Sequence, residues 1–134
     1  MLDPDHVPPV APEERLARFV LFSRHFRSSD NSVKADAFMP HPLIELSMTR
    51  HLQATSDELW QEGGRVSTLR SATLYGRADV LASAFAEQAL SVEAAPLREN
   101  PNHVNATGWP PEKPQQKIKA MEISIRSQFV PSPA

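Results

Sequence analysis

Residues 43–51 read Leu-Ile-Glu-Leu-Ser-Met-Thr-Arg-His, and this stretch decides the fold class. Ile44, Leu46 and Met48 are apolar, while the residues between them are polar. Successive side chains of a β-strand point to opposite faces of a sheet, so the alternation predicts a strand with one buried and one polar face. Arg50 continues the buried face, and a charge buried there requires a partner.

The segments on either side of this strand predict a helix and a second strand. Thr55 and Glu58 have the spacing of a capping box, which predicts a helix reaching Leu69. Gly63-Gly64 weakens the middle of that helix. Upstream, residues 16–22 are apolar on both faces, which is typical of a central strand covered on both sides.

The remaining elements follow from shorter patterns. Strands are expected at 33–38, 90–94 and 103–107. Residues 79–89 fit a helix, and a strand from 77 to 83 competes with it. Pro110 and Pro111 suit the first turn of a last helix. Its buried face is expected to carry Ile118, Met121, Ile125 and Phe129.

Together these segments predict one small α+β domain, with a mixed or antiparallel sheet of three to six strands packed by two or three helices. A chain of 134 residues is an ordinary length for a single domain. Prolines cluster at both ends of the chain. They predict an extended proline-rich leader at 1–12, the domain at 13–130 and a loose tail at 131–134.

Composition excludes several classes of protein. The 14 basic and 16 acidic residues give a net charge of −2, which argues against a general nucleic-acid binder. No apolar run approaches the roughly 20 residues of a membrane helix, so no membrane partner is expected. The chain has no cysteine, which excludes disulfides and thiolate metal sites and fits a cytoplasmic location.

The strong catalytic and nucleotide-binding motifs are absent. No phosphate-binding glycine loop, dinucleotide fingerprint, His-Glu-x-x-His sequence or serine elbow occurs, and four glycines leave little room for a glycine-rich loop. The sequence therefore leaves open whether the protein is an enzyme, and it implies no particular cofactor.

Arginines and histidines gather at the ends of the predicted elements, where folds usually hold functional groups. Guanidinium groups bind phosphate and carboxylate, and histidine can transfer protons near neutral pH. The candidate ligand-binding residues are Arg24, His25, Arg27, Arg50, Arg77, Asp79 and Asn105. The candidates for acid–base work are His103, Tyr75 and His51.

Arg50 is the most informative of these residues. Its partner could be Asp79, Glu122 or a bound anion. Alternatively, it could lie past the edge of the sheet and extend its charged end into water.

A metal site has little support. The five histidines lack the i, i+4 or i, i+2 spacing of neighbouring ligands. A site would have to combine separate segments, for example His51, His103 and Asp79, and no metal is predicted.

Residues 32–38, 46–50, 74–79 and the stretch from 102 to 110 resemble a group of small uncharacterised bacterial proteins. The resemblance implies a bacterial, intracellular protein and carries no activity with it.

Two functions fit these observations. In the first, the domain recognises an anionic ligand through an Arg/His cluster, the ligand being a nucleotide, a phosphorylated metabolite or a nucleic-acid end. In the second, it is a non-catalytic protein-interaction module of a bacterial multi-protein assembly. The arginines would then form salt bridges, and the proline-rich ends would bind partners.

Overall fold

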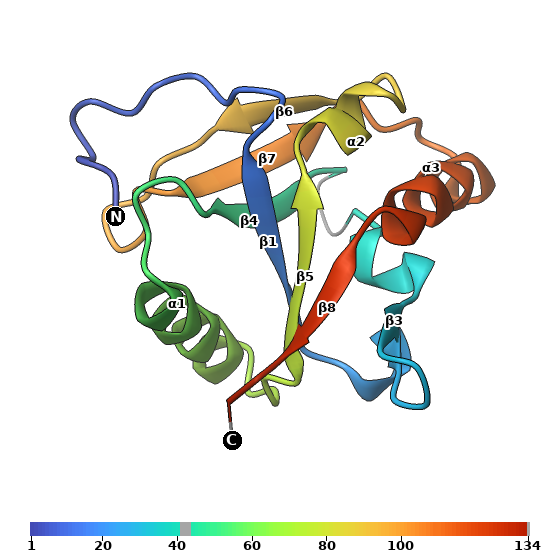
Figure 1. The fold of residues 1–134 in the computed structure, drawn as a ribbon. Coiled ribbons are helices and arrows are strands. Elements are labelled where there is room, and N and C mark those ends of the chain that lie inside the picture. Colours follow the sequence, from blue (N-terminus) through green and yellow to red (C-terminus); the bar gives the residue numbers. More distant parts are fainter. Residues whose placement is uncertain (41–43, 134) are drawn as a thin grey trace.

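A computed structural model describes residues 1–40 and 44–133, and it confirms the α+β prediction (Figure 1). A six-stranded sheet has the order β6-β7-β4-β1-β5-β8, and β2 pairs with β3 in a separate hairpin. Every ladder is antiparallel. The strands are β1 (Arg15–Val20), β2 (Phe26–Arg27), β3 (Ser32–Val33), β4 (Leu46–Arg50), β5 (Gly76–Leu81), β6 (Ser91–Ala94), β7 (His103–Thr107) and β8 (Gln128–Pro131). The helices are α1 (Ser56–Leu69), α2 (Ser83–Ala86) and α3 (Lys113–Ile125), with short 3-10 turns η1 (Ser23–His25) and η2 (Ala35–Phe38).

The central strand β1 pairs unequally with its two neighbours. It runs beside β5 over six registered pairs, from Arg15 with Leu81 to Val20 with Gly76. Its ladder with β4 has only two pairs and ends at Ala17 with Thr49. In Figure 1, β4 and β7 accordingly run at a wide angle to β1 and β5. The sheet therefore splits between β1 and β4 beyond Ala17.

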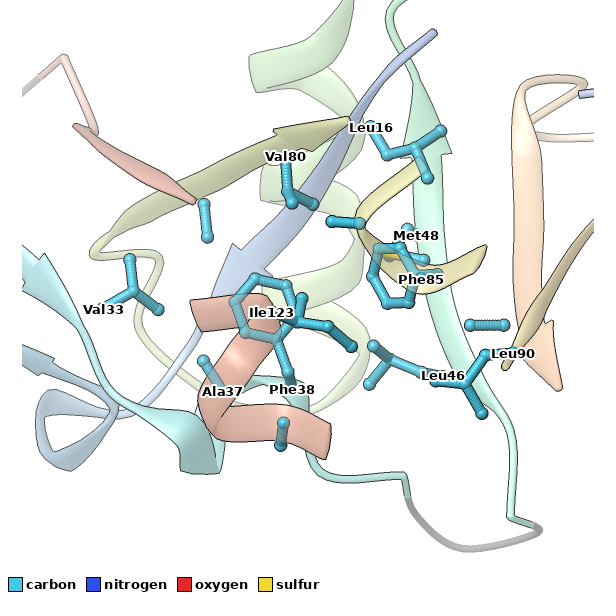
Figure 2. Close-up of a cluster of buried hydrophobic side chains, with 14 of the residues drawn as sticks. Leu16, Val33, Ala37, Phe38, Leu46, Met48, Val80, Phe85, Leu90 and Ile123 are labelled. Carbon is cyan, nitrogen blue, oxygen red and sulfur yellow. The ribbon is translucent and has the colours of Figure 1, made fainter. Parts of the chain in front are cut away.

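One face of the sheet carries the main core. Leu16, Met48 and Val80 point from three strands toward Phe85 and Ile123, which come from α2 and α3 (Figure 2). The Phe38 ring of η2 meets Phe85 edge-on, with centroids 6.3 Å apart. Burying each of these large apolar side chains contributes about 1.5–3 kcal/mol.

Helix α1 covers the opposite face, and its first turn confirms the predicted capping box. The Thr55 hydroxyl accepts from the Glu58 backbone N–H at 3.1 Å, and the Glu58 carboxylate accepts from the Thr55 N–H at 2.9 Å. Gly63 has a packing role, because a Cβ there would lie 2.9 Å from the Phe19 ring. The glycine that weakens the helix locally thus lets α1 approach the sheet.

The N-terminal segment contacts the domain at several points. The Leu2 N–H donates to Asn102 Oδ1 at 2.9 Å, and the Leu2 side chain is buried. The terminal ammonium lies 3.2 Å from the Glu58 carboxylate. Further along, Pro8 and Pro9 accept hydrogen bonds from Arg50.

Two predicted strands are shorter than expected. The 33–38 strand was wrong beyond Val33, because the chain turns into η2 with the Ala37 N–H donating to the Lys34 carbonyl. The 43–51 strand begins only at Leu46. Ile44 has a positive φ of 58° and is 43% exposed, so it does not join the core. The predicted residue 43 lies outside the described residues.

Two other predictions concern segments whose structure depends on tertiary packing. Residues 79–89 divide between the end of β5 and the short helix α2, with Phe85 in the core. The buried face predicted for α3 was wrong. Ile118, Met121 and Ile125 are exposed, and Phe129 belongs to β8. The buried face instead carries Gln116, Ala120, Ile123 and Ser124.

Candidate functional site

The candidate site is a cleft at the point where β1 and β4 separate. It has a volume of about 170 Å³ and lies between the split sheet, helix α1 and the segment leading into β7. The residues that line it are Arg18, Phe19, Leu21, Phe22, His25, Ser47, Met48, Thr49, Glu62, Arg65, Val66, Arg70, Leu97, Asn100 and His103. We call it the split-sheet cleft.

Arg18 occupies the gap left by the broken ladder. Its Nε donates to the Ala37 carbonyl at 2.9 Å, and its Nη1 donates to the Ser47 carbonyl at 3.0 Å. Among the described residues no carboxylate forms an ion pair with it. Burial, with a further contribution from the positive charge of Arg70, lowers the pKa of Arg18 to about 10. Arg18 therefore stays charged at neutral pH in a partly desolvated position.

Helix α1 contributes two more arginines to the cleft. Arg65 Nε donates to the buried carboxylate of Glu62 at 2.8 Å, so these two charges offset each other. Arg70 caps the C-terminus of α1 and is exposed, and it forms no ion pair within residues 1–40 and 44–133. Arg65 Nη1 also lies 3.9 Å from the Glu99 carboxylate, so the excess of positive charge in the lining comes from Arg18 and Arg70.

His25 lies at the end of η1 on the cleft wall. Burial lowers its pKa to about 4, and the positive charges of Arg24 and Arg18 act in the same direction. The imidazole is therefore neutral at pH 7. In that state one ring nitrogen can donate to a ligand and the other can accept.

The far wall carries further polar groups. His103 Nδ1 lies 2.9 Å from the Ala95 carbonyl, and because a carbonyl only accepts, Nδ1 carries a proton and donates to it. Asn100 Nδ2 donates to Thr49 Oγ1 at 3.0 Å. The Ser47 hydroxyl donates to Asn105 Oδ1 at 3.1 Å, so it is not paired with a catalytic base. This arrangement is suited to binding.

Of the predicted site residues, His25 and His103 line the cleft, and two others lie beside it. Asn105 holds Ser47, while the exposed Arg24 packs 4.6 Å from the centre of the Phe22 ring. The cleft thus contains one histidine from the predicted ligand-binding residues, His25, and one from the predicted acid–base residues, His103.

Arg50 does not reach the cleft. Its guanidinium is fully buried and forms a two-pronged ion pair with Glu14, at 2.7 Å and 2.6 Å. It also donates to the Pro8 carbonyl at 2.7 Å and the Pro9 carbonyl at 3.2 Å. The expected partners were therefore wrong: Glu14 and the proline-rich segment satisfy Arg50 in place of Asp79, Glu122 or an anion.

Arg77, Asp79 and His51 form a separate cluster on the α1 side of the sheet. Arg77 Nε donates to Asp79 Oδ1 at 3.0 Å, and His51 Nε2 lies 2.9 Å from the same oxygen. The Arg77 guanidinium also packs 4.6 Å from the centre of the Trp60 ring. His103 does not join this cluster, and in the described part of the chain no three metal-ligating side chains come together.

Tyr75 and Arg27 also lie away from the cleft. Tyr75 packs against the Phe26 ring, with centroids 5.6 Å apart. Arg27 is exposed, and its Nη1 donates to Ser32 Oγ at 3.3 Å. Both belong to the side of the fold formed by the β2–β3 hairpin.

The sequence interpretation missed Arg18 and Arg70. Arg18 carried a usable signal, because it lies between Leu16 and Val20 on an inward-facing row of a predicted strand. The same argument had identified Arg50. Arg70 carried none, since its position beside Arg18 depends on how α1 crosses the sheet.

Within the described residues, each helix is too short or too polar to cross a membrane. Comparison with protein-family models, with curated proteins and with solved structures finds no match to this chain. The resemblance to small bacterial proteins, and the cytoplasmic location, therefore stay predictions.

Proposed function

We propose that the split-sheet cleft binds a small anionic ligand through a phosphate or carboxylate group. The observation that carries the proposal is the charge of Arg18, which is partly desolvated and beside Arg70, with no carboxylate partner among the described residues. Arg50 and Arg77 are neutralised by Glu14 and Asp79. Arg18 and Arg70, in contrast, form no ion pair that would neutralise their charge among the described residues.

The size of the cleft limits what it can enclose. Pockets for drug-sized ligands occupy roughly 300–1,000 Å³, whereas this cleft measures about 170 Å³. It can therefore hold one anionic group with a few attached atoms. In a phosphorylated metabolite or a nucleotide, the remainder would extend past the exposed Arg70.

The polar groups around the cleft suit an anion of this kind. A guanidinium binds a phosphate or carboxylate oxygen through charge-assisted hydrogen bonds, which are shorter and stronger than neutral ones. In Arg18, Nε and Nη1 already donate to the Ala37 and Ser47 carbonyls, so Nη2 is the donor it would offer to a ligand. Arg70 would donate from the end of α1. The neutral His25 can add one more hydrogen bond. An anion would also offset the like-charge repulsion between the two arginines.

Titration calorimetry tests the proposal with inorganic phosphate, pyrophosphate, citrate and adenosine monophosphate as probes. We expect at least one probe to bind the wild type, and Arg70→Ala to weaken it by roughly tenfold or more, since a charged hydrogen bond contributes about 1.5–3 kcal/mol. Arg15→Ala is the matched control, because Arg15 is exposed at the opposite end of β1. Equal binding by both variants, or no binding of any probe, would refute the proposal.

The second candidate function is the protein-interaction module. It is favoured by a different feature of the fold, the exposed apolar side chains of α3.

A further inference from the structure

Helix α3 presents an apolar row to solvent. Ile118, Met121 and Ile125 are 63%, 50% and 75% exposed. Their i, i+3, i+7 spacing places them on one side of the helix, over a length of about 10 Å. The opposite side of α3 packs into the core through Ala120 and Ile123. The exposed row is therefore an apolar face that the fold itself leaves uncovered.

A groove runs beside this row. It lies between α3 and the segment that contains β3 and η2, and its volume is about 470 Å³. Met121 and Ile125 line it on the α3 side, and Val33 and Ala35 line it on the other. The remaining lining residues are Arg27, Ser32, Lys34, Asp36, Lys117, Ser124 and Ser127. We call this the α3 groove.

The charges of the α3 groove have a clear sign. Lys117 Nζ forms an ion pair with Asp36 at 2.6 Å, which neutralises both. Arg27 and Lys34 form no ion pair with the described residues. The Asp30 carboxylate partly offsets the positive charge of Arg27. However, it accepts a hydrogen bond from the Ser32 hydroxyl, and Asp30 does not line the groove. The groove is thus apolar with a basic rim, in a chain whose net charge is −2.

We propose that the α3 groove binds a short acidic, amphipathic helical segment of a partner protein. Apolar side chains one and two turns apart would lie along the exposed row, and acidic side chains would meet Arg27 and Lys34. A second copy of the same face fits less well, because two-fold pairing would bring the basic rims together. The concave shape also suits a chain segment better than a flat membrane surface.

This inference is independent of the anion-binding proposal. The α3 groove and the split-sheet cleft share no lining residue. Loss of peptide binding through a substitution in one therefore leaves ligand binding in the other intact, and the two proposals can fail separately.

The test is selection of a display library of short random segments on the purified full chain. Selected segments are expected to be enriched in acidic residues and to carry apolar residues at helical intervals. Ile125→Asp and Lys34→Glu are each expected to reduce the affinity of a selected segment by roughly tenfold or more. Leu69→Asp, which alters an equally exposed apolar residue on α1 (71%), should leave the affinity unchanged. Circular dichroism and thermal melting establish that each variant is folded.

Other outcomes would overturn the proposal. These are selected segments without acidic enrichment, binding that survives Ile125→Asp in a folded variant, or no selected segment at all. Sedimentation equilibrium tests whether a second copy of the chain occupies the groove, and flotation with anionic phospholipid vesicles tests whether a membrane does. Self-association or vesicle binding that Ile125→Asp abolishes would assign this face to a second copy or to a membrane.

Discussion

The ion pair between Arg50 and Glu14 should be among the most sensitive points of the fold. Arg50 is fully buried, and the Glu14 side chain is 10% exposed. Burial raises the pKa of Glu14, but hydrogen bonds from Arg50 and the Ala11 N–H, with the charge of Arg50, outweigh it and lower the pKa overall. Glu14→Gln keeps the shape of the side chain and removes its charge. It therefore leaves the Arg50 guanidinium buried without a counter-charge.

Breaking a buried pair in this way costs about 3–5 kcal/mol. In a domain of this size that corresponds to a fall in Tm of roughly 10–20 °C. The double variant Glu14→Gln/Arg50→Met removes the stranded charge, so it should be more stable than Glu14→Gln alone. The expected coupling between the two sites exceeds about 1 kcal/mol. Because Arg50 also donates to Pro8 and Pro9, Glu14→Gln should expose residues 1–12 to proteolysis.

Urea unfolding of the wild type, both single variants and the double variant measures these free energies. The Arg126→Ala variant is the control, since it removes an exposed pair with Glu87 and should cost less than about 1 kcal/mol. If Glu14→Gln costs no more than Arg126→Ala, or the two sites show no coupling, the reasoning about a buried structural pair is refuted.

Two further predictions concern stability and protonation. Gly63→Ala should destabilise the fold by about 1–3 kcal/mol through overpacking against Phe19. Gly64→Ala should stabilise it by up to about 1 kcal/mol, because alanine has the higher helix propensity and the added Cβ meets no atom within 4 Å apart from its chain neighbours and the backbone of its own helix. Thermal melts compare the two, and equal effects would contradict the close approach of α1 to the sheet. His25 should titrate near pH 4 in the native state, against 6.5 unfolded, as read by NMR of its ring. Between about pH 4 and 6.5, the unfolded chain therefore binds a proton at His25 that the native state does not. The free energy of unfolding falls as the pH decreases through this range, and above pH 6.5 the contribution of His25 to stability is fully present. His25→Gln should flatten this part of the stability profile, and an unchanged profile would count against a pKa lowered by partial burial of the imidazole.

Local patterns predicted the elements whose environment is set by nearby residues. Alternation identified the strand at 46–50, and the Thr55–Glu58 spacing identified the start of α1. In α3, periodicity identified the helix but selected the wrong side. The large apolar side chains face out because α3 packs against η2 and turns inward a side that includes the small Ala120 and Ser124. Which side of α3 is buried depends on the element that packs against the helix. The sequence of the helix alone therefore cannot predict the buried side.

The site shows the same division between local and long-range information. His25 and His103 were identified from their places at the ends of predicted elements, and both line the cleft. Arg50 was correctly placed on an inward face, but its partner Glu14 lies 36 residues away and its choice depends on the strand register. Arg18 depends on a further fact, the end of the β1–β4 ladder at Ala17. That end depends on how β1 and β4 diverge in the folded sheet, and no local pattern encodes it.

The most direct test of the anion site follows the Arg18 Nε–Hε and His25 ring signals by NMR during titration with pyrophosphate. Binding in the split-sheet cleft should shift both signals and leave the α3 signals unchanged. It should also raise the pKa of His25 above the value of about 4 that this residue has in the ligand-free protein. The raised pKa follows because a bound anion offsets the positive charges of Arg18 and Arg24. Arg70→Ala should weaken all of these changes together. Signals of Arg18 and His25 that stay fixed while pyrophosphate binds elsewhere, or does not bind, would contradict the account.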